Sequence, residues 1–266
     1  MDILYQLPFP DDVCSKIFMF TCKSPHSGFT EVILKKIIGL PIYNKLVEKS
    51  GIVLDGEGHV KEFQVWTKNG NKLLEDGERE QLTVDIANLE SLPNLTTIDL
   101  FNTGVTGNIV HLESLHNLTE IWLDNSDVTG TIENLKSLPN LTEIGLSYTG
   151  VTGDIVHLKS LKNLTVIDLY GTSVSGNIAH LESLKNLTGI HLNNTDVTGN
   201  IEHLKSLKNL TEIRIGYTDV TGDIAHLESL PKLLQIYLKN TGVTGNVEAF
   251  HNYRKSTGLP ECYLDM

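Results

Sequence analysis

Five histidines occupy the same place in a repeating stretch of the sequence, and stacked imidazoles of this kind suggest metal binding. Their positions differ by 23 residues or twice that number: His111, His157, His180, His203 and His226, with Asn134 in the remaining slot. Zinc requires four ligands arranged tetrahedrally at about 2.0–2.1 Å. Ligands that lie one repeat apart form a line and cannot surround one ion. We therefore expect a ladder that bonds backbone or water, and neither a metal site nor another cofactor.

A second set of residues is of the type that performs general acid–base catalysis. It comprises Asp99, Asp124, Asp168 and His191. Catalytic groups of this kind usually lie in a cleft that changes their pKa values, and a flat, open sheet has none. The sequence also contains no Gly-Lys-Ser/Thr phosphate loop and no nucleophile elbow. We predict that the chain is not an enzyme; the enzyme hypothesis would require turnover that is abolished by substitution of Asp99 or Asp168.

The elements that position these residues repeat every 23 residues. The marker is the leucine of an Asn-Leu (once Lys-Leu) pair: Leu95, Leu118, Leu141, Leu164, Leu187, Leu210 and Leu233. In the first of these units, Ile98 and Leu100 alternate as in a strand buried on one face, and Thr103-Gly104 and Thr106-Gly107 indicate turns. The following apolar residues are three apart, which favours a 3₁₀ segment over an α-helix. One unit cannot cover its own apolar residues, so the units must stack as a solenoid.

This unit resembles the leucine-rich repeat, whose pattern L-x-x-L-x-L-x-x-N-x-L is matched by Leu95, Ile98, Leu100 and Val105. The Thr-Gly-x-Ile that follows is similar to the plant-type repeat. The resemblance implies an α/β solenoid: a right-handed horseshoe with a parallel concave β-sheet and a 3₁₀ or irregular convex side. One departure is systematic, because the asparagine of the family pattern is replaced by Thr or Ser: Thr103, Ser126, Thr149, Thr172, Thr195, Thr218 and Thr241. We expect these hydroxyls to bond the backbone of a neighbouring unit.

Residues 1–50 do not repeat, and apolar spacing predicts helices near 13–20, 32–38 and 43–48. One interpretation is a helical cap that shields the first unit. The alternative is docking: Leu7-Pro8, followed by Asp11, Val13, Ile17 and Phe18, resembles the opening of an F-box. That resemblance implies contact with a ubiquitin-ligase adaptor through the N-terminal helices.

Residues 51–249 are assigned to the repeats. Residues 51–66 predict an entry hairpin and a degenerate first unit, in which Val60, Phe63 and Val65 keep the repeat spacing. The step from Val60 to Leu95 is 35 residues, one period plus 12, and we assign the surplus to a polar loop over 68–81. Residues 250–266 form a predicted C-terminal cap, in which Phe250 and Tyr253 close the core.

The positions that differ between units indicate the surface that is free to specialise. Strand alternation places them on the sheet face away from the core. The predicted partner-binding residues are Asp99, Phe101, Asn102, Glu120, Trp122, Asp124, Glu143, Tyr148, Asp168, Tyr170, His191, Arg214, Tyr217 and Tyr237. Acids occupy the first four units, and Trp and Tyr are common at interface hot spots. We predict a protein partner with a basic or mixed-charge surface.

Composition limits the remaining classes of function. The net charge of −12 disfavours nucleic acid and anionic membranes as partners, and no apolar run is long enough to span a membrane. Acids near the N-terminus, where a secretory signal carries bases, predict an intracellular protein with reduced cysteines. The repeat itself accounts for the Asn-Leu-Thr sequons. The predicted function is a non-catalytic protein-binding module. The alternatives are a substrate-recognition subunit of a ubiquitin ligase and a structural subunit of a larger assembly.

Overall fold

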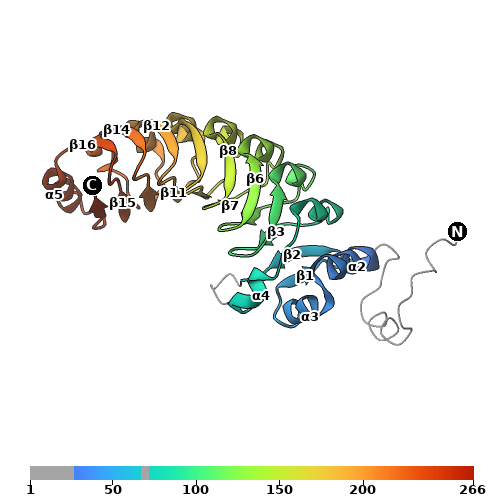
Figure 1. Ribbon diagram of the computed structural model, residues 1–266. Coiled ribbons are helices and arrows are strands. Elements are labelled where there is room, and N and C mark those ends of the chain that lie inside the picture. Colours follow the sequence, from blue (N-terminus) through green and yellow to red (C-terminus); the bar gives the residue numbers. More distant parts are fainter. Residues whose placement is uncertain (1–26, 67–71) are drawn as a thin grey trace, which may run out of the picture.

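The computed structural model describes residues 27–66 and 72–266, which form a curved solenoid of stacked coils (Figure 1). Its inner side is a ten-stranded sheet, which we call the concave sheet, in the order β1-β2-β3-β5-β7-β9-β11-β13-β15-β17. β1 and β2 are antiparallel, and every later neighbour is parallel. The strands are β1 Ile52–Leu54, β2 Val60–Gln64, β3 Thr97–Asp99, β5 Glu120–Trp122, β7 Glu143–Gly145, β9 Val166–Asp168, β11 Gly189–His191, β13 Glu212–Arg214, β15 Gln235–Tyr237 and β17 Tyr263–Asp265.

A second, seven-stranded parallel sheet lies on the outer side, and we call it the outer sheet. Its strands are β4 Thr106–Asn108, β6 Asp127–Thr131, β8 Gly150–Asp154, β10 Ser173–Asn177, β12 Asp196–Asn200, β14 Asp219–Asp223 and β16 Gly242–Thr244. The prediction of a turn at Thr106-Gly107 is therefore wrong. Gly107 has a positive φ of 103°, and its backbone pairs with Val128 of the next coil although its sequence is typical of a turn.

The return segments are 3₁₀ helices, as the three-residue spacing predicts. They are η1 Ile86–Ser91, η2 Ile109–Leu112, η3 Ile132–Ser137, η4 Ile155–Ser160, η5 Ile178–Ser183, η6 Ile201–Ser206 and η7 Ile224–Leu227. An Asp, Asn or Thr side chain caps each one; in η4 the Asp154 carboxylate accepts the Val156 N–H at 2.7 Å. Each coil directs leucine, isoleucine and valine into one continuous core, and the seven apolar positions of the first full coil are fully buried.

Hydrogen bonds between coils come from residues other than those expected. The Thr103 hydroxyl donates to the Leu100 carbonyl of its own coil at 2.7 Å, so the predicted bond to a neighbouring coil is wrong. Because Leu100 lies only three residues before Thr103 along a tight bend, its carbonyl is closer to the Thr103 hydroxyl than the backbone of a neighbouring coil is. Two other positions form the ladders. The Thr142 hydroxyl donates to the Thr119 carbonyl at 2.9 Å, and the Asn140 amide donates to the His116 carbonyl at 3.0 Å.

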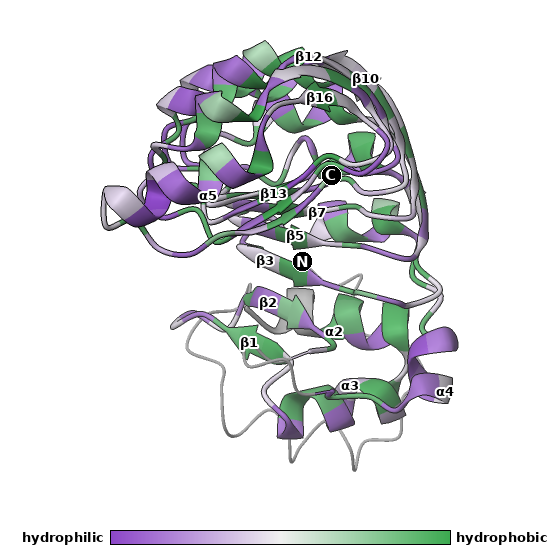
Figure 2. Cartoon of the chain, turned by 90° about the vertical axis from the view of Figure 1, so that its left-hand side faces the viewer, coloured by the Kyte–Doolittle hydropathy of each residue, from purple (hydrophilic) through white to green (hydrophobic). Residues whose placement is uncertain are grey.

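Two described helices, α2 Ser27–Ile38 and α3 Leu40–Glu48, lie at the N-terminal end of the solenoid (Figures 1 and 2). Leu34, Ile38, Tyr43 and Leu46 are buried in the same core as the first coils. Helix α2 ends just before Gly39, and Pro41 lies in the first turn of α3, where its missing N–H is tolerated. The predicted helix near 13–20 and the whole F-box-like pattern over residues 7–18 lie outside the described residues. The docking interpretation stays a prediction.

The insertion after β2 is more ordered than the polar loop that we expected over 68–81. Within its described part, Leu73 and Leu74 are buried and Asp76–Glu80 form the helix α4, capped by Glu75. Two adjacent leucines are too short a run to register as a period, yet they suffice to anchor the segment. The Lys45 ammonium of α3 contacts the Glu78 carboxylate of α4 at 2.5 Å.

At the other end, α5 (Val247–Ser256) covers the last coil and the chain returns to add β17 to the concave sheet. Phe250 is buried as predicted, but Tyr253 is exposed, and the buried partner is Arg254. Its guanidinium donates to the carbonyls of Glu228, Leu230, Leu233 and Pro260 at 2.7–3.1 Å. These bonds satisfy carbonyls that no further coil would reach. None of the described helices is long and apolar enough to cross a membrane.

Candidate functional site

The concave sheet aligns its outward residues in a row with one residue from each strand. Asp99, Trp122, Gly145, Asp168, His191, Arg214 and Tyr237 are direct neighbours in this order. The isoleucine before each of them is buried, so alternation places this row on the surface, as expected. The parallel row, two residues earlier, holds Thr97, Glu120, Glu143, Val166, Gly189, Glu212 and Gln235.

Two further rows of outward residues, which begin with Phe101 and Asn102, do not lie in strands. The concave strands after β2 are only three residues long, so alternation does not extend to Phe101 and Asn102. The row that begins with Asn102 has φ values of 53–67°: Asn102, Asn125, Tyr148, Gly171, Asn194, Tyr217 and Asn240. These residues form the left-handed bend after each strand, which is uncommon for tyrosine. Tyr148 and Tyr217 project from this bend and are 55% and 52% exposed.

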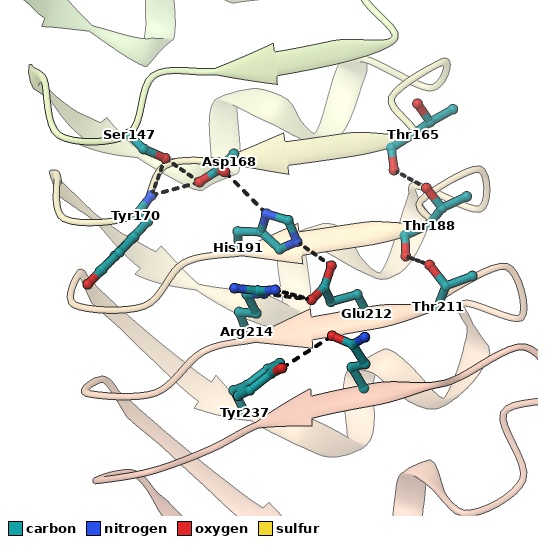
Figure 3. A network of polar contacts seen from close by, with 11 residues as sticks. Ser147, Thr165, Asp168, Tyr170, Thr188, His191, Thr211, Glu212, Arg214 and Tyr237 are labelled. Carbon is teal, nitrogen blue, oxygen red and sulfur yellow. Dashed lines mark hydrogen bonds and ion pairs between the residues drawn. The ribbon is translucent and has the colours of Figure 1, made fainter. Parts of the chain in front are cut away.

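A chain of polar contacts crosses five coils of the concave face (Figure 3). The Ser147 hydroxyl donates to Asp168 Oδ1, and Asp168 Oδ2 contacts His191 Nδ1 at 3.2 Å. His191 Nε2 lies 3.1 Å from Glu212 Oε2, and Arg214 Nε donates to Glu212 Oε1 at 2.6 Å. The guanidinium of Arg214 lies 4.8 Å from the centre of the Tyr237 ring.

The order of the side chains in this series of contacts determines what chemistry it can perform. In a hydrolytic triad the imidazole lies between the hydroxyl and the carboxylate. Here Asp168 lies between Ser147 and His191, so the imidazole cannot take the serine proton. Burial lowers the pKa of His191, but the hydrogen bond and charge of Asp168 and the charge of Glu212 raise it more, so its pKa lies above the ordinary value. The network stabilises a charged imidazolium and provides no activated nucleophile.

Two other carboxylates have strongly shifted pKa values. Burial raises the pKa of Asp124 to about 7, and the charge of Asp168 adds to this. Burial also raises the pKa of Asp99 to about 6, with a further contribution from Glu120. The expectation that an open sheet leaves pKa values unchanged is therefore wrong. Side chains on neighbouring strands are packed closely enough to remove water from the shortest acids.

Aromatic residues form pairs along the same face. The rings of Tyr148 and Tyr170 are 4.6 Å apart, and those of Tyr237 and Tyr263 are 5.4 Å apart. Trp66 and Phe101 meet edge to face at 5.7 Å. Trp66 and Tyr263 are not among the predicted binding residues, because they lie outside the seven regular repeats. A signal for Trp66 was available, since it follows the degenerate first strand.

Three of the five histidines in the row, His111, His203 and His226, contact acids, which differs from the expected bonds to backbone or water. His111 Nδ1 lies 2.5 Å from Glu90, His203 lies 3.4 Å from Glu182 and the Asn134 amide donates to Glu113 at 2.6 Å. Each contact joins one coil to the coil before it. Across residues 27–66 and 72–266, no group of three or more His, Cys, Asp or Glu side chains is arranged to hold a metal ion.

Comparison with solved structures finds plant receptors and a bacterial protein. The plant peptide hormone receptor RGFR1 in complex with RGF2 is 27% identical over 59% of this chain and 26% of that chain, with a TM-score of 0.54. The ectodomain of the Arabidopsis receptor kinase HAESA in complex with an IDA peptide hormone is 20% identical over 90% of this chain and 41% of that chain, with a TM-score of 0.69. Internalin C2 from Listeria monocytogenes is 21% identical over 89% of this chain and 91% of that chain, with a TM-score of 0.56.

The two receptor structures are much longer than this chain, which spans 26% and 41% of their lengths. No protein-family model matches the chain, and no curated protein sequence does so either. The regular 23-residue coils, the parallel concave sheet, the 3₁₀ returns and the structural matches agree with one another. The chain has the leucine-rich-repeat solenoid fold.

Proposed function

We propose that the chain is a non-catalytic binding module that holds a protein or peptide partner against its concave sheet. The observation that carries this proposal is the contrast between constant core residues and unlike outward residues on the same strands. Strands β3, β5, β7 and β9 direct Asp99, Glu120, Trp122, Glu143 and Asp168 outward. A scaffold that only stacks has no need of such variety.

Charge supports a partner with basic groups. Outward positions of the first four regular coils hold no Lys or Arg, and Arg214 and Lys239 appear only in the last two. Complementary charge accelerates encounter and selects partners. The receptor domains named above carry peptide hormones in their structures, which supports the use of this fold for peptide binding. We extend the same use to this chain, inside the cell.

The test is substitution of Trp122 and Tyr148 together by alanine, followed by capture of partners from native extract and measurement of affinity for the captured protein. We expect a loss of several kcal/mol, because exposed aromatic anchors dominate interface energetics. The matched control replaces Thr129 and Thr152, two exposed residues of the outer sheet in the same two coils. Unchanged affinity in the aromatic variant, or an equal loss in the control, would refute the concave-face assignment.

A further inference from the structure

The carboxylate of Asp124 has one oxygen without a hydrogen-bond partner in the described part of the chain. Asp124 follows β5, and its side chain is almost fully buried, with 5% of the residue exposed. Its Oδ1 accepts the backbone N–H of Ser147 at 2.7 Å, whereas Oδ2 contacts no donor. A buried acceptor left in this state costs free energy unless a ligand or a proton satisfies it.

The space around Oδ2 is bounded by an aromatic ring and a glycine. Gly145 has no side chain, and a Cβ built there would collide both with the six-membered ring of Trp122 and with Asp124 Oδ2. The ring and the free oxygen therefore share the space above Gly145. Trp122 is only half-buried, so its ring separates this oxygen from solvent without being locked in the core.

Titratable groups on the adjacent strands are acidic. Asp99 lies in β3, Glu120 in β5, Glu143 in β7 and Asp168 in β9, and the base His191 of β11 contacts Asp168. The charges of Asp168 and Glu120 act on Asp124 and Asp99 respectively. A neutral hydrogen-bond donor could satisfy Oδ2, but only a cation would also offset this field.

We propose that Trp122, Asp124, Asp99 and Gly145 form a seat for the guanidinium group of an arginine that a peptide or protein partner presents. This proposal deepens the proposed function and rests on it. On binding, the half-buried Trp122 ring turns aside from above Gly145, so that the guanidinium stacks on the face of the ring and donates to the uncovered Asp124 Oδ2, while its other N–H groups face the Asp99 carboxylate. A planar group with several donors fits this combination better than an ammonium, which has no flat face to stack.

The test uses three capped pentapeptides, Gly-Gly-X-Gly-Gly, in which X is arginine, lysine or the neutral arginine analogue citrulline. Binding to the full chain is followed by NMR at the indole N–H of Trp122, assigned with Trp122→Phe. We expect saturable binding of the arginine peptide, weaker binding of the lysine peptide and none of the citrulline peptide. Asp124→Asn should weaken arginine binding about tenfold, since a charge-assisted hydrogen bond is lost. Asp127→Asn, the same charge change on the outer face of the same coil, should leave it unchanged.

A second measurement does not depend on any variant. The NMR chemical shift of the Asp124 carboxyl carbon is followed against pH with and without saturating arginine peptide. The bound cation should move the titration midpoint to lower pH. The arginine site would be refuted by any of three results: the citrulline peptide binds as tightly as the arginine peptide, Asp124→Asn keeps its affinity for the arginine peptide, or the titration midpoint of Asp124 does not move. If any of these results occurs while the Trp122 and Tyr148 variant still loses partner capture, the proposed binding module stands and only the proposed arginine site is refuted. Retained capture by that variant would refute the concave-face assignment on which the arginine site rests.

Discussion

The two parallel sheets of this molecule use the same backbone repeat for different purposes. In the outer sheet, one position is Gly in all seven coils, from Gly107 to Gly245, and the residue before it is Thr or Ser. In the concave sheet, the row from Asp99 to Tyr237 contains six residue types in seven coils. The glycine position of the outer sheet is constant for a steric reason. No such constraint acts on the outward rows of the concave sheet. The difference shows which surface the fold requires and which it leaves free.

The steric cause is visible at Gly176 in β10. Its φ is 110°, a conformation that other residues rarely adopt, and a Cβ there would lie 2.7 Å from the carboxyl carbon of Asp154. Asp154 is itself required, because it caps η4. Each glycine of the row from Gly107 to Gly245 thus makes room for the side chain that caps the helix of the preceding coil.

The largest effect should come from a methyl group added in the outer sheet. Gly176→Ala should lower the free energy of unfolding by about 4 kcal/mol, because backbone strain and a steric clash add. The matched change in the concave sheet is Gly189→Ala, where the nearest atom to a new Cβ is 3.7 Å away. We expect it to change stability by less than about 0.5 kcal/mol. Urea unfolding of both variants checks the comparison, which fails if the two losses are equal.

The same comparison shows which features the sequence could predict. The period, the strand at Ile98 and the 3₁₀ return follow from apolar spacing, because burial in a stack acts on every coil alike. The outer sheet could not be predicted in this way, since Thr106-Gly107 has the composition of a turn and pairs only because Val128 of the next coil lies beside it. Leu73 and Tyr263 were missed for a related reason: each occurs once, outside any period.

The site was predictable in position but not in chemistry. The outward placement of Trp122 and Asp168 follows from alternation, while the bend at Tyr148 depends on strands that end after three residues. The raised pKa of Asp124 depends on Trp122 and Asp124 sharing the space above Gly145, three positions whose contact is not encoded in their spacing. Contacts between unlike side chains of successive coils cannot be predicted from the repeat spacing.

The second effect concerns the buried acid of the concave face. The pKa of Asp124 is raised from 3.8 to about 7, so the folded protein binds its proton more tightly than the unfolded chain does. This group does not oppose folding below pH 4; its unfavourable contribution grows between pH 4 and 7 and is constant above. The shift sets an upper limit of about 4 kcal/mol, and we expect about 3 kcal/mol. The unfolding free energy of the unmodified chain should therefore fall by this amount between pH 4 and 8, and that of Asp124→Asn should not.

The control for that measurement lies on the other sheet. Asp127→Asn removes a carboxylate from the exposed face of β6, three residues away in the same coil. Its pH profile should follow that of the unmodified chain. If Asp124→Asn also follows it, the carboxylate of Asp124 is hydrated in the folded protein and the distinction between the two faces is weaker than we infer.

The smallest effect separates a histidine of the concave face from one of the convex return. His191 contacts two carboxylates, Asp168 and Glu212, and is half-buried, whereas His203 reaches only Glu182 at 3.4 Å. Because the folded pKa of His191 is raised above 6.5, the stability that its proton contributes is fully present below pH 6.5 and is lost as pH rises through the folded pKa. His191→Gln should therefore destabilise the protein at pH 5.5 by about 1.5 kcal/mol, the low end for one hydrogen bond to a charged group, and by less at pH 8.5. His203→Gln should change neither value measurably, since exposed ion pairs contribute little. An equal response of the two variants would mean that the network in Figure 3 is no stronger than the surface contacts between coils, and that its order serves recognition and not stability.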